Sequence, residues 1–205
     1  MKVVFDFGGV LFDWHPPSLL RRELPHLVDD DASAAHWVAE IFQGYAGDWG
    51  EFDRGTVEPK ALVQRIATRT GLAPADVQRV VDGVPHELQP KPESLALLHR
   101  LHDAGYGLYF LSNMPEPFVD HLERTHGFLE LFQDGVFSSR VKHIKPASEI
   151  FHIAAERFGH PPQHLVFLDD TLPNVEAASA LGWQGLHFTG AEQAIRDLQA
   201  AGLRF

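Results

Sequence analysis

The 205-residue sequence predicts an α/β fold with a doubly wound parallel sheet, helices on both faces and a helical insertion. Three observations predict it. Short apolar runs alternate with stretches of helical periodicity near both ends of the chain, which is typical of strand-helix-strand units. Several of these runs end in polar side chains, as expected at the ligand-binding edge of an open α/β sheet. The long interval after the first run contains no convincing strand.

Five apolar runs are short and continuous enough to form buried parallel strands. They are Val3–Phe5, Leu108–Leu111, Val136–Phe137, Leu165–Leu168 and Gly185–Phe188. Right-handed crossovers between them would build one sheet whose carboxyl ends share an edge.

The segments between the later runs have helical spacing and helix-ending glycines. Leu95, Leu98 and Leu101 mark one helix, which stops at Gly105. The predicted helices are Pro92–Ala104, Ala147–Phe158, Pro173–Leu181 and Ala191–Ala201, with a further start after Met114-Pro115.

The interval from Asp13 to Leu88 is predicted to be helical and bordered by prolines. Its helices are expected at Pro17–Leu24, Ala32–Phe42, Glu58–Thr70 and Pro74–Val84. Because it leaves the sheet after the first strand and returns before the second, it would cover the strand ends as a lid and exclude water. We therefore expect a core domain of residues 1–12 and 89–205 and a helical cap of residues 13–88.

Composition excludes several classes of function. Seventeen Lys and Arg residues against 28 Asp and Glu residues give a net charge of −11, which disfavours nucleic acid and anionic membranes as partners. The absence of cysteine excludes disulfides, thiolate catalysis and Cys-ligated zinc, and fits a cytoplasmic protein. The amino terminus does not read as a signal peptide, and no apolar stretch is long enough to span a bilayer. Composition predicts no oligomeric state.

Three carboxylates are expected to meet at the sheet edge. Asp6 follows the first strand, with Gly8 and Gly9 allowing a close ligand approach, and Asp169 and Asp170 follow the fourth. Two unit charges about 4 Å apart repel by roughly 4 kcal/mol at an effective dielectric of 20, so the cluster needs a cation. Oxygen ligands without Cys or paired His select Mg²⁺. A carboxylate at the position of Asp6 can also attack phosphorus.

Two further polar segments end at the same edge. Ser112 and Asn113 follow the second strand and precede a helix start, which suits an anion. Lys145 stands before Pro146, which fixes the first turn of the next helix, so its ammonium would neutralise phosphoryl oxygens from a defined loop. Together these segments predict a phosphate-processing site.

The four motifs resemble those of the haloacid dehalogenase (HAD) superfamily, over nearly the whole chain. The resemblance implies a Rossmann-like core with a C1-type cap, and a small phosphorylated substrate. It implies that Asp6 is the nucleophile, that Ser112, Asn113 and the Gly9 loop hold the phosphoryl group, and that Lys145 is its counter-charge. It also implies Mg²⁺ on Asp6, the Gly8 carbonyl and Asp170, with Asp169 and Asn174 supporting the metal.

Gly8 departs from the pattern, because most phosphatases of this superfamily have an aspartate there as general acid and base. Such proton transfer is typically worth about 10² to 10⁴ in rate. The side chains of Asp13, His15, Asp48, Glu51 and Asp53 are candidate replacements, although each reads more readily as a solvated surface group.

The closest resemblance is to bacterial sugar-phosphate phosphatases such as α-glucose-1-phosphate phosphatase, which also have glycine at this position. The sequence therefore predicts a phosphomonoester hydrolase that acts through an aspartyl phosphate. Two alternatives remain: a 2-haloacid dehalogenase, which needs no metal and also lacks the second acid, and a binding or regulatory protein with little turnover.

Overall fold

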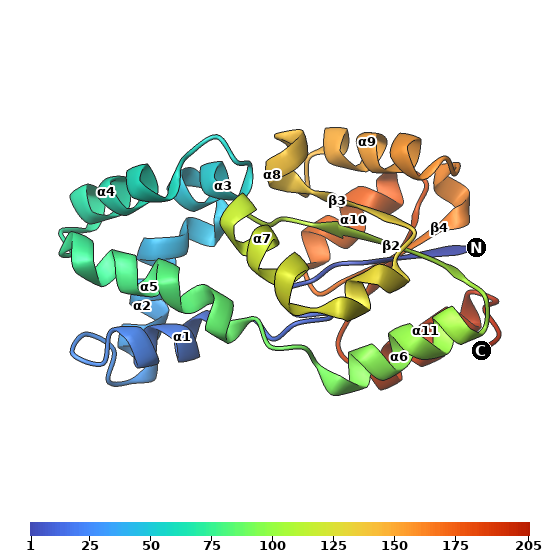
Figure 1. The fold of residues 1–205 in the computed structure, drawn as a ribbon, viewed down its shortest axis with the longest axis horizontal. Helices are drawn as coiled ribbons and strands as arrows, with labels where there is room; N and C mark the ends of the chain where they lie inside the picture. Colours follow the sequence, from blue (N-terminus) through green and yellow to red (C-terminus); the bar gives the residue numbers. More distant parts are fainter.

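A computed structural model describes all residues, 1–205, as a five-stranded parallel sheet with helices on both faces and a helical insertion at one end of it (Figure 1). The strands are β1 (Lys2–Phe5), β2 (Gly107–Ser112), β3 (Asp134–Phe137), β4 (Leu165–Asp169) and β5 (Gln184–His187). Their order in the sheet is β3-β2-β1-β4-β5. The predicted doubly wound α/β fold is thereby confirmed, with β1 at the centre.

Alternate residues of the central strands face two separate apolar layers. Val3 and Phe5 of β1 pack with α6 (Pro92–Asp103) and α11 (Ala191–Ala200) on one face. Val4 packs with α9 (Ser148–Phe158) and α10 (Leu172–Ala180) on the other. This alternation follows from the period of two along a strand, and it explains why the runs are apolar throughout.

The remaining elements of the sheet region connect these layers. They are α7 (Glu116–Thr125), α8 (Ser138–Val141) and the 3₁₀ turns Gly127–Leu131 and Pro162–His164. None of the helices combines the length and the apolar character needed to cross a membrane.

The insertion between β1 and α6 contains only helices and turns. Its elements are α1 (Pro16–Glu23), α2 (Asp31–Phe42), the 3₁₀ turn Gln43–Tyr45, α3 (Gly47–Asp53), α4 (Pro59–Thr70) and α5 (Pro74–Glu87). Buried side chains from all five helices belong to the same apolar cluster as the face of the sheet that packs against α6 and α11. In Figure 1 the five helices form a separate lobe beyond one end of the strands.

Two of the predicted elements differ in their bounds by more than one residue. Strand β3 begins at Asp134 rather than Val136, because Gly135 pairs with Phe110 and leaves room for its ring; a Cβ at Gly135 would lie 2.1 Å from that ring. Helix α5 continues through Pro85 to Glu87 instead of stopping at Val84.

Helix α3 was not predicted, because its glycines and acidic residues favour a loop. Trp49 and Phe52 are nonetheless buried, and Gly50 lies so close to the chain that a Cβ would be 2.5 Å from the Tyr45 carbonyl oxygen. Tertiary packing thus overrides local propensity in this segment.

Candidate active site

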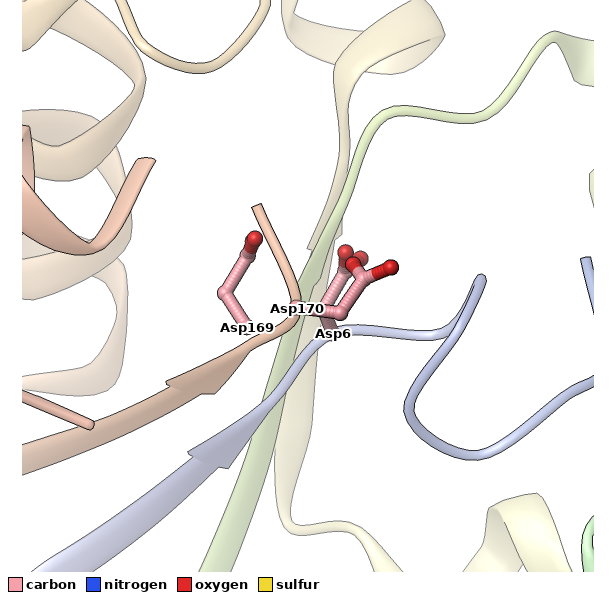
Figure 2. Close-up of side chains that lie close together, drawn as sticks. All are labelled: Asp6, Asp169 and Asp170. Atoms are coloured by element: carbon pink, nitrogen blue, oxygen red, sulfur yellow. The ribbon is translucent and has the colours of Figure 1, made fainter. Parts of the chain in front are cut away.

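The carboxyl ends of β1 and β4 bring the three predicted carboxylates together. The Asp6 N–H donates to the Leu168 carbonyl at 2.9 Å, which fixes the two strand ends side by side. Asp6, Asp169 and Asp170 each offer an oxygen atom within 4.8 Å of the others. We call these three residues the acidic cluster. Figure 2 shows the Asp6 and Asp170 carboxyl groups next to each other, with Asp169 to one side of them.

Lys145 joins two members of the acidic cluster. Its Nζ lies 2.9 Å from Asp6 Oδ1 and 2.6 Å from Asp169 Oδ2, and it donates to the Leu111 carbonyl at 3.0 Å. These contacts use all three ammonium hydrogens in a side chain that is almost fully buried. Burial alone would lower the pKa of Lys145, but the Asp169 and Asp6 carboxylates raise it, so the lysine is charged.

Asp169 has little capacity left for another ligand. Its Oδ1 accepts from the Thr171 N–H at 2.8 Å, and Asn174 Nδ2 lies 3.1 Å from both carboxylate oxygens. With Lys145 added, its lone pairs are largely occupied. Asp169 therefore holds Lys145 and the strand-to-helix loop in place, and Asn174 orients Asp169.

Asp6 and Asp170 retain free oxygen atoms. Asp6 Oδ1 accepts from the Phe7 N–H at 2.7 Å and from Lys145, which leaves Oδ2 without a donor. Burial raises the pKa of Asp6 to about 7; Lys145 opposes that rise, whereas Asp169 and Asp170 add to it. The pKa of Asp170 is also raised, by burial and by Asp169.

The acidic cluster has the donors that a hard cation requires. One lysine does not balance three carboxylates, and the remaining negative charge would be relieved by a divalent ion. The Gly8 carbonyl, two residues after Asp6, accepts none of the backbone hydrogen bonds of the turn after β1, whereas the Phe7 carbonyl accepts several. An all-oxygen set of this kind fits Mg²⁺.

Position 9 requires a glycine, because its backbone is left-handed and the Asp170 side chain lies close to it. Its φ is +73°, and a Cβ there would lie 2.1 Å from Asp170 Oδ2. Lys91 donates to the Gly9 carbonyl at 2.8 Å and so fixes the turn from 82 residues away. Sequence reasoning missed Lys91, because a lysine between two prolines carries no local signal of this contact.

The second polar segment supports the lysine loop. Asn113 Nδ2 donates to the Lys145 carbonyl at 3.0 Å, and Asn113 Oδ1 accepts from the Lys145 N–H at 2.8 Å. One N–H of Nδ2 is left for another acceptor. Ser112, the last residue of β2, is 1% exposed and lies at the same edge.

Trp14 occupies the space beside Gly8. A Cβ at Gly8 would lie 3.6 Å from Trp14 Cβ and 3.8 Å from Cγ. Trp14 Nε1 donates to the Tyr45 hydroxyl at 2.7 Å, so the indole connects the chain after β1 with the loop before α3. Tyr45, at φ +61°, was also missed, because nothing in the sequence predicts this long-range bond.

Of the five candidate proton donors, three have other partners and a fourth is exposed. His15 caps α1 by accepting from the Ser18 N–H, and Asp13 is exposed. Asp48 pairs with Arg69 at 3.1 Å, and Glu51 pairs with Arg54.

Asp53 differs from these four. It is 5% exposed, no protein group donates a hydrogen bond to its carboxyl group, and burial raises its pKa to about 8. Lys145 opposes that rise and Asp6 adds to it.

A cavity of about 560 Å³ lies where the chain crosses between the sheet and the insertion. Trp14 and His15 line it from the first crossing, and Gln89 and Lys91 from the second. It adjoins the site through Gly9, but no member of the acidic cluster lines it.

Comparison with known proteins agrees with this geometry. Residues 3–182 match the family described as hydrolase, haloacid dehalogenase-like hydrolase. A sesquiterpene phosphatase from Aspergillus oryzae is 29% identical, covering 96% of this chain and 93% of its own length. A phosphoglycolate phosphatase from Salmonella paratyphi A is 25% identical, covering 91% of this chain and 80% of its own.

A solved structure shows the same fold. A HAD family enzyme from Bacteroides thetaiotaomicron superimposes with a TM-score of 0.71 at 22% identity, covering 91% of this chain and 92% of the other. That structure contains magnesium and inorganic phosphate.

Proposed function

The chain belongs to the haloacid dehalogenase-like hydrolase family, and from that premise we propose that it is a Mg²⁺-dependent phosphomonoester hydrolase for a small phosphorylated metabolite. One observation carries the proposal. Lys145 Nζ bridges the buried Asp6 and Asp169 in a cluster of three carboxylates whose third member, Asp170, is exposed, at the edge of the sheet where ligands bind. A structural ion pair would need neither the excess of negative charge nor the free Asp6 oxygen.

In this proposal Asp6 is the nucleophile. Its Oδ2 carries no protein donor, and Lys145 favours the ionised form of the carboxyl group that attack requires. The remaining N–H of Asn113, the Ser112 hydroxyl and the backbone around Gly9 would hold the phosphoryl oxygens. Asp169 and Asn174 act by positioning Lys145.

Asp6, Asp170 and the Gly8 carbonyl are the groups that would hold Mg²⁺. When bound, the ion supplies positive charge against the phosphoryl oxygens and the carboxylates. Asp169 is a weaker candidate for direct coordination than the sequence predicted, because its oxygens already accept from Lys145, Thr171 and Asn174.

The helical insertion would act as the cap, with residues 1–12 and 89–205 as the core. Its loop before α3 reaches Trp14 at the site through the Tyr45 hydroxyl. The cap would therefore exclude water and select the substrate. We place sugar phosphates first among the substrates, because an anomeric oxygen is a better leaving group than an ordinary alcohol oxygen and Gly8 supplies no acid. The Aspergillus relative makes a sesquiterpenyl phosphate the second class to test.

A dehalogenase or a non-catalytic protein would not need this cluster. Dehalogenation proceeds without a metal, whereas the three carboxylates here exceed what one lysine balances. A scaffold would gain nothing from burying Lys145 against Asp6.

Two assays test the proposal. We expect hydrolysis of p-nitrophenyl phosphate and of at least one sugar or terpenyl phosphate with Mg²⁺, and none in EDTA. Asp6→Asn should abolish it, whereas Asp120→Asn, an exposed change on α7, should leave it intact. Full activity of Asp6→Asn would refute the mechanism, and halide release from a 2-haloacid in EDTA would favour dehalogenation.

A further inference from the structure

The proposed reaction leaves one proton unassigned. When Asp6 displaces an alkoxide from phosphorus, the departing oxygen needs a proton, and Gly8 has no side chain to give one. Lys145 uses all three hydrogens on other partners, and Asp169 only accepts. The following inference rests on the proposed function and asks which group of this chain completes it.

The space beside Gly8 is closed to a donor from the core. Trp14 lies there in ordinary van der Waals contact, 3.6 Å from where a Cβ of residue 8 would stand. Its single N–H donates to Tyr45, so it is already used. A proton donor must therefore come from another side of the site, such as the one where the insertion meets the end of β2.

Asp53, the last residue of α3, is fixed at this side. Its carbonyl accepts a 2.6 Å hydrogen bond from Ser138 Oγ, which in turn accepts from the Met114 N–H at 2.9 Å. Met114 is two residues beyond Ser112. The backbone of Asp53 is thus tied to the end of β2, next to the proposed phosphate seat, although it belongs to the cap.

The charges of the site reach the carboxyl group of Asp53. Besides burial, Lys145 and Asp6 are the two groups that shift its pKa, Lys145 downward and Asp6 upward. The residue is 5% exposed, no protein group donates a hydrogen bond to its carboxyl group, and its oxygens are not fully sealed from solvent. A carboxyl group buried to this extent without an ion-pair partner is costly to ionise, and such groups cluster at functional sites.

The environment keeps Asp53 protonated near neutral pH. Burial raises its pKa to about 8, Lys145 lowers it and Asp6 raises it. A carboxylic acid that stays neutral at pH 7 can donate a proton to a leaving group and take one back later.

We propose that Asp53 is the general acid and base of this enzyme, supplied by the cap in place of the side chain missing at Gly8. In the first step Asp6 forms a bond to phosphorus, the phosphorus–oxygen bond to the leaving group breaks, and the Asp53 proton passes to that oxygen to give the alcohol. In the second, water bonds to phosphorus, the acyl phosphate bond to Asp6 breaks, and a water proton returns to Asp53. Phosphate is released and both carboxyl groups are regenerated.

The dependence on the leaving group tests this assignment. Asp53→Asn keeps the size of the side chain and removes the transferable proton. We expect kcat/KM for an alkyl phosphate to fall about 10² to 10⁴-fold. For p-nitrophenyl phosphate, whose leaving group departs without protonation, it should fall less than about 10-fold. A purely structural role would lower both values equally.

Two further variants keep the test decisive. Asp82→Asn, an exposed change of the same kind on α5, should alter neither value. Tyr45→Phe removes the other hydroxyl near the site. If Tyr45→Phe shows the leaving-group-selective loss and Asp53→Asn does not, or if Asp53→Asn lowers both rates equally, the proposal is wrong. If the wild type hydrolyses neither ester with Mg²⁺, the proposed function itself fails and this inference fails with it.

Discussion

The Ser138 hydroxyl donates a 2.6 Å hydrogen bond to the backbone carbonyl of Asp53, linking residues 85 apart in sequence. The same oxygen accepts from the Met114 N–H at 2.9 Å, and Ser138 is fully buried. Lys142 adds a second link to the same part of the insertion, since its Nζ donates to the Gly55 carbonyl at 2.7 Å. The insertion is therefore held against the sheet edge at the backbone of Asp53 and Gly55.

Ser138→Ala should loosen this connection. The change leaves the Met114 N–H without its acceptor, and a buried unsatisfied donor costs about 1–3 kcal/mol. We expect the free energy of unfolding to fall by that amount and kcat for an alkyl phosphate to fall several-fold, because Asp53 loses its anchor. Urea unfolding and steady-state kinetics measure the two effects. Ser148→Ala, at an exposed site, is the control; equal effects from both serines would contradict the linkage.

Lys145→Met should damage both stability and activity. It leaves Asp6 and Asp169 buried without their cation, and breaking a buried pair from one side costs about 3–5 kcal/mol. Hydrolysis should be lost because Asp6 is no longer held ionised. Lys60→Met, at an exposed position on α4, should change neither property. Wild-type stability in Lys145→Met would show that the ion pair is not the organising contact.

Adjacent glycines should respond differently to alanine. At Gly8 a methyl group meets Trp14 at an ordinary 3.6 Å, so Gly8→Ala should keep Mg²⁺-dependent activity within a few-fold. At Gly9 the φ of +73° and the 2.1 Å approach to Asp170 Oδ2 force a displacement of Asp170 or of the turn.

Thermal unfolding with Mg²⁺ separates the two variants without an activity assay. A ligand at 100 times its Kd stabilises the folded state by about 2.7 kcal/mol. We expect Mg²⁺ to raise the Tm of the wild type and of Gly8→Ala, and to have little effect on Gly9→Ala. A similar Mg²⁺ response in all three proteins would argue against Asp170 as a ligand.

The sequence predicted the parts of the site that follow from local patterns. Asp6 and Asp169 stand directly after apolar runs, and parallel strands in one sheet must end at one edge, so their meeting was foreseeable. Lys145 was expected to be held by Pro146 in the first turn of the next helix, but α9 begins only at Ser148, so Pro146 lies outside it. Asn113 was placed correctly at the edge, but its side chain binds the backbone of Lys145, a contact that depends on a loop 32 residues away.

The contribution of the insertion was less predictable. Asp53 stands among acidic and glycine residues and reads as a solvated charge, and only its packing against Ser138 shows otherwise. The contact of Lys91 was equally unpredictable. Its acceptor is the backbone carbonyl of Gly9, and a residue of any type at that position would offer the same oxygen. Contacts of side chains with a distant backbone leave no periodic pattern in the sequence.

Asp53→Asn should make the protein more stable than the wild type, and this difference should grow as the pH rises. The ordinary pKa of the group is 3.8, and folding raises it to about 8, so between these values the folded state binds more protons than the unfolded state. Stability therefore falls with rising pH through this window because of Asp53, and the loss is complete above the folded pKa. Asparagine does not titrate and removes that loss.

The gain in unfolding free energy that Asp53→Asn brings should be larger at pH 8 than at pH 5, by an amount on the order of a few kcal/mol. Urea unfolding at both pH values without Mg²⁺ measures it, with Asp82→Asn as the control. A gain that does not vary with pH would mean that Asp53 is not buried as a neutral acid. A variant that is more stable yet selectively slower on alkyl phosphates would instead be the signature of a side chain kept for proton transfer at the expense of stability.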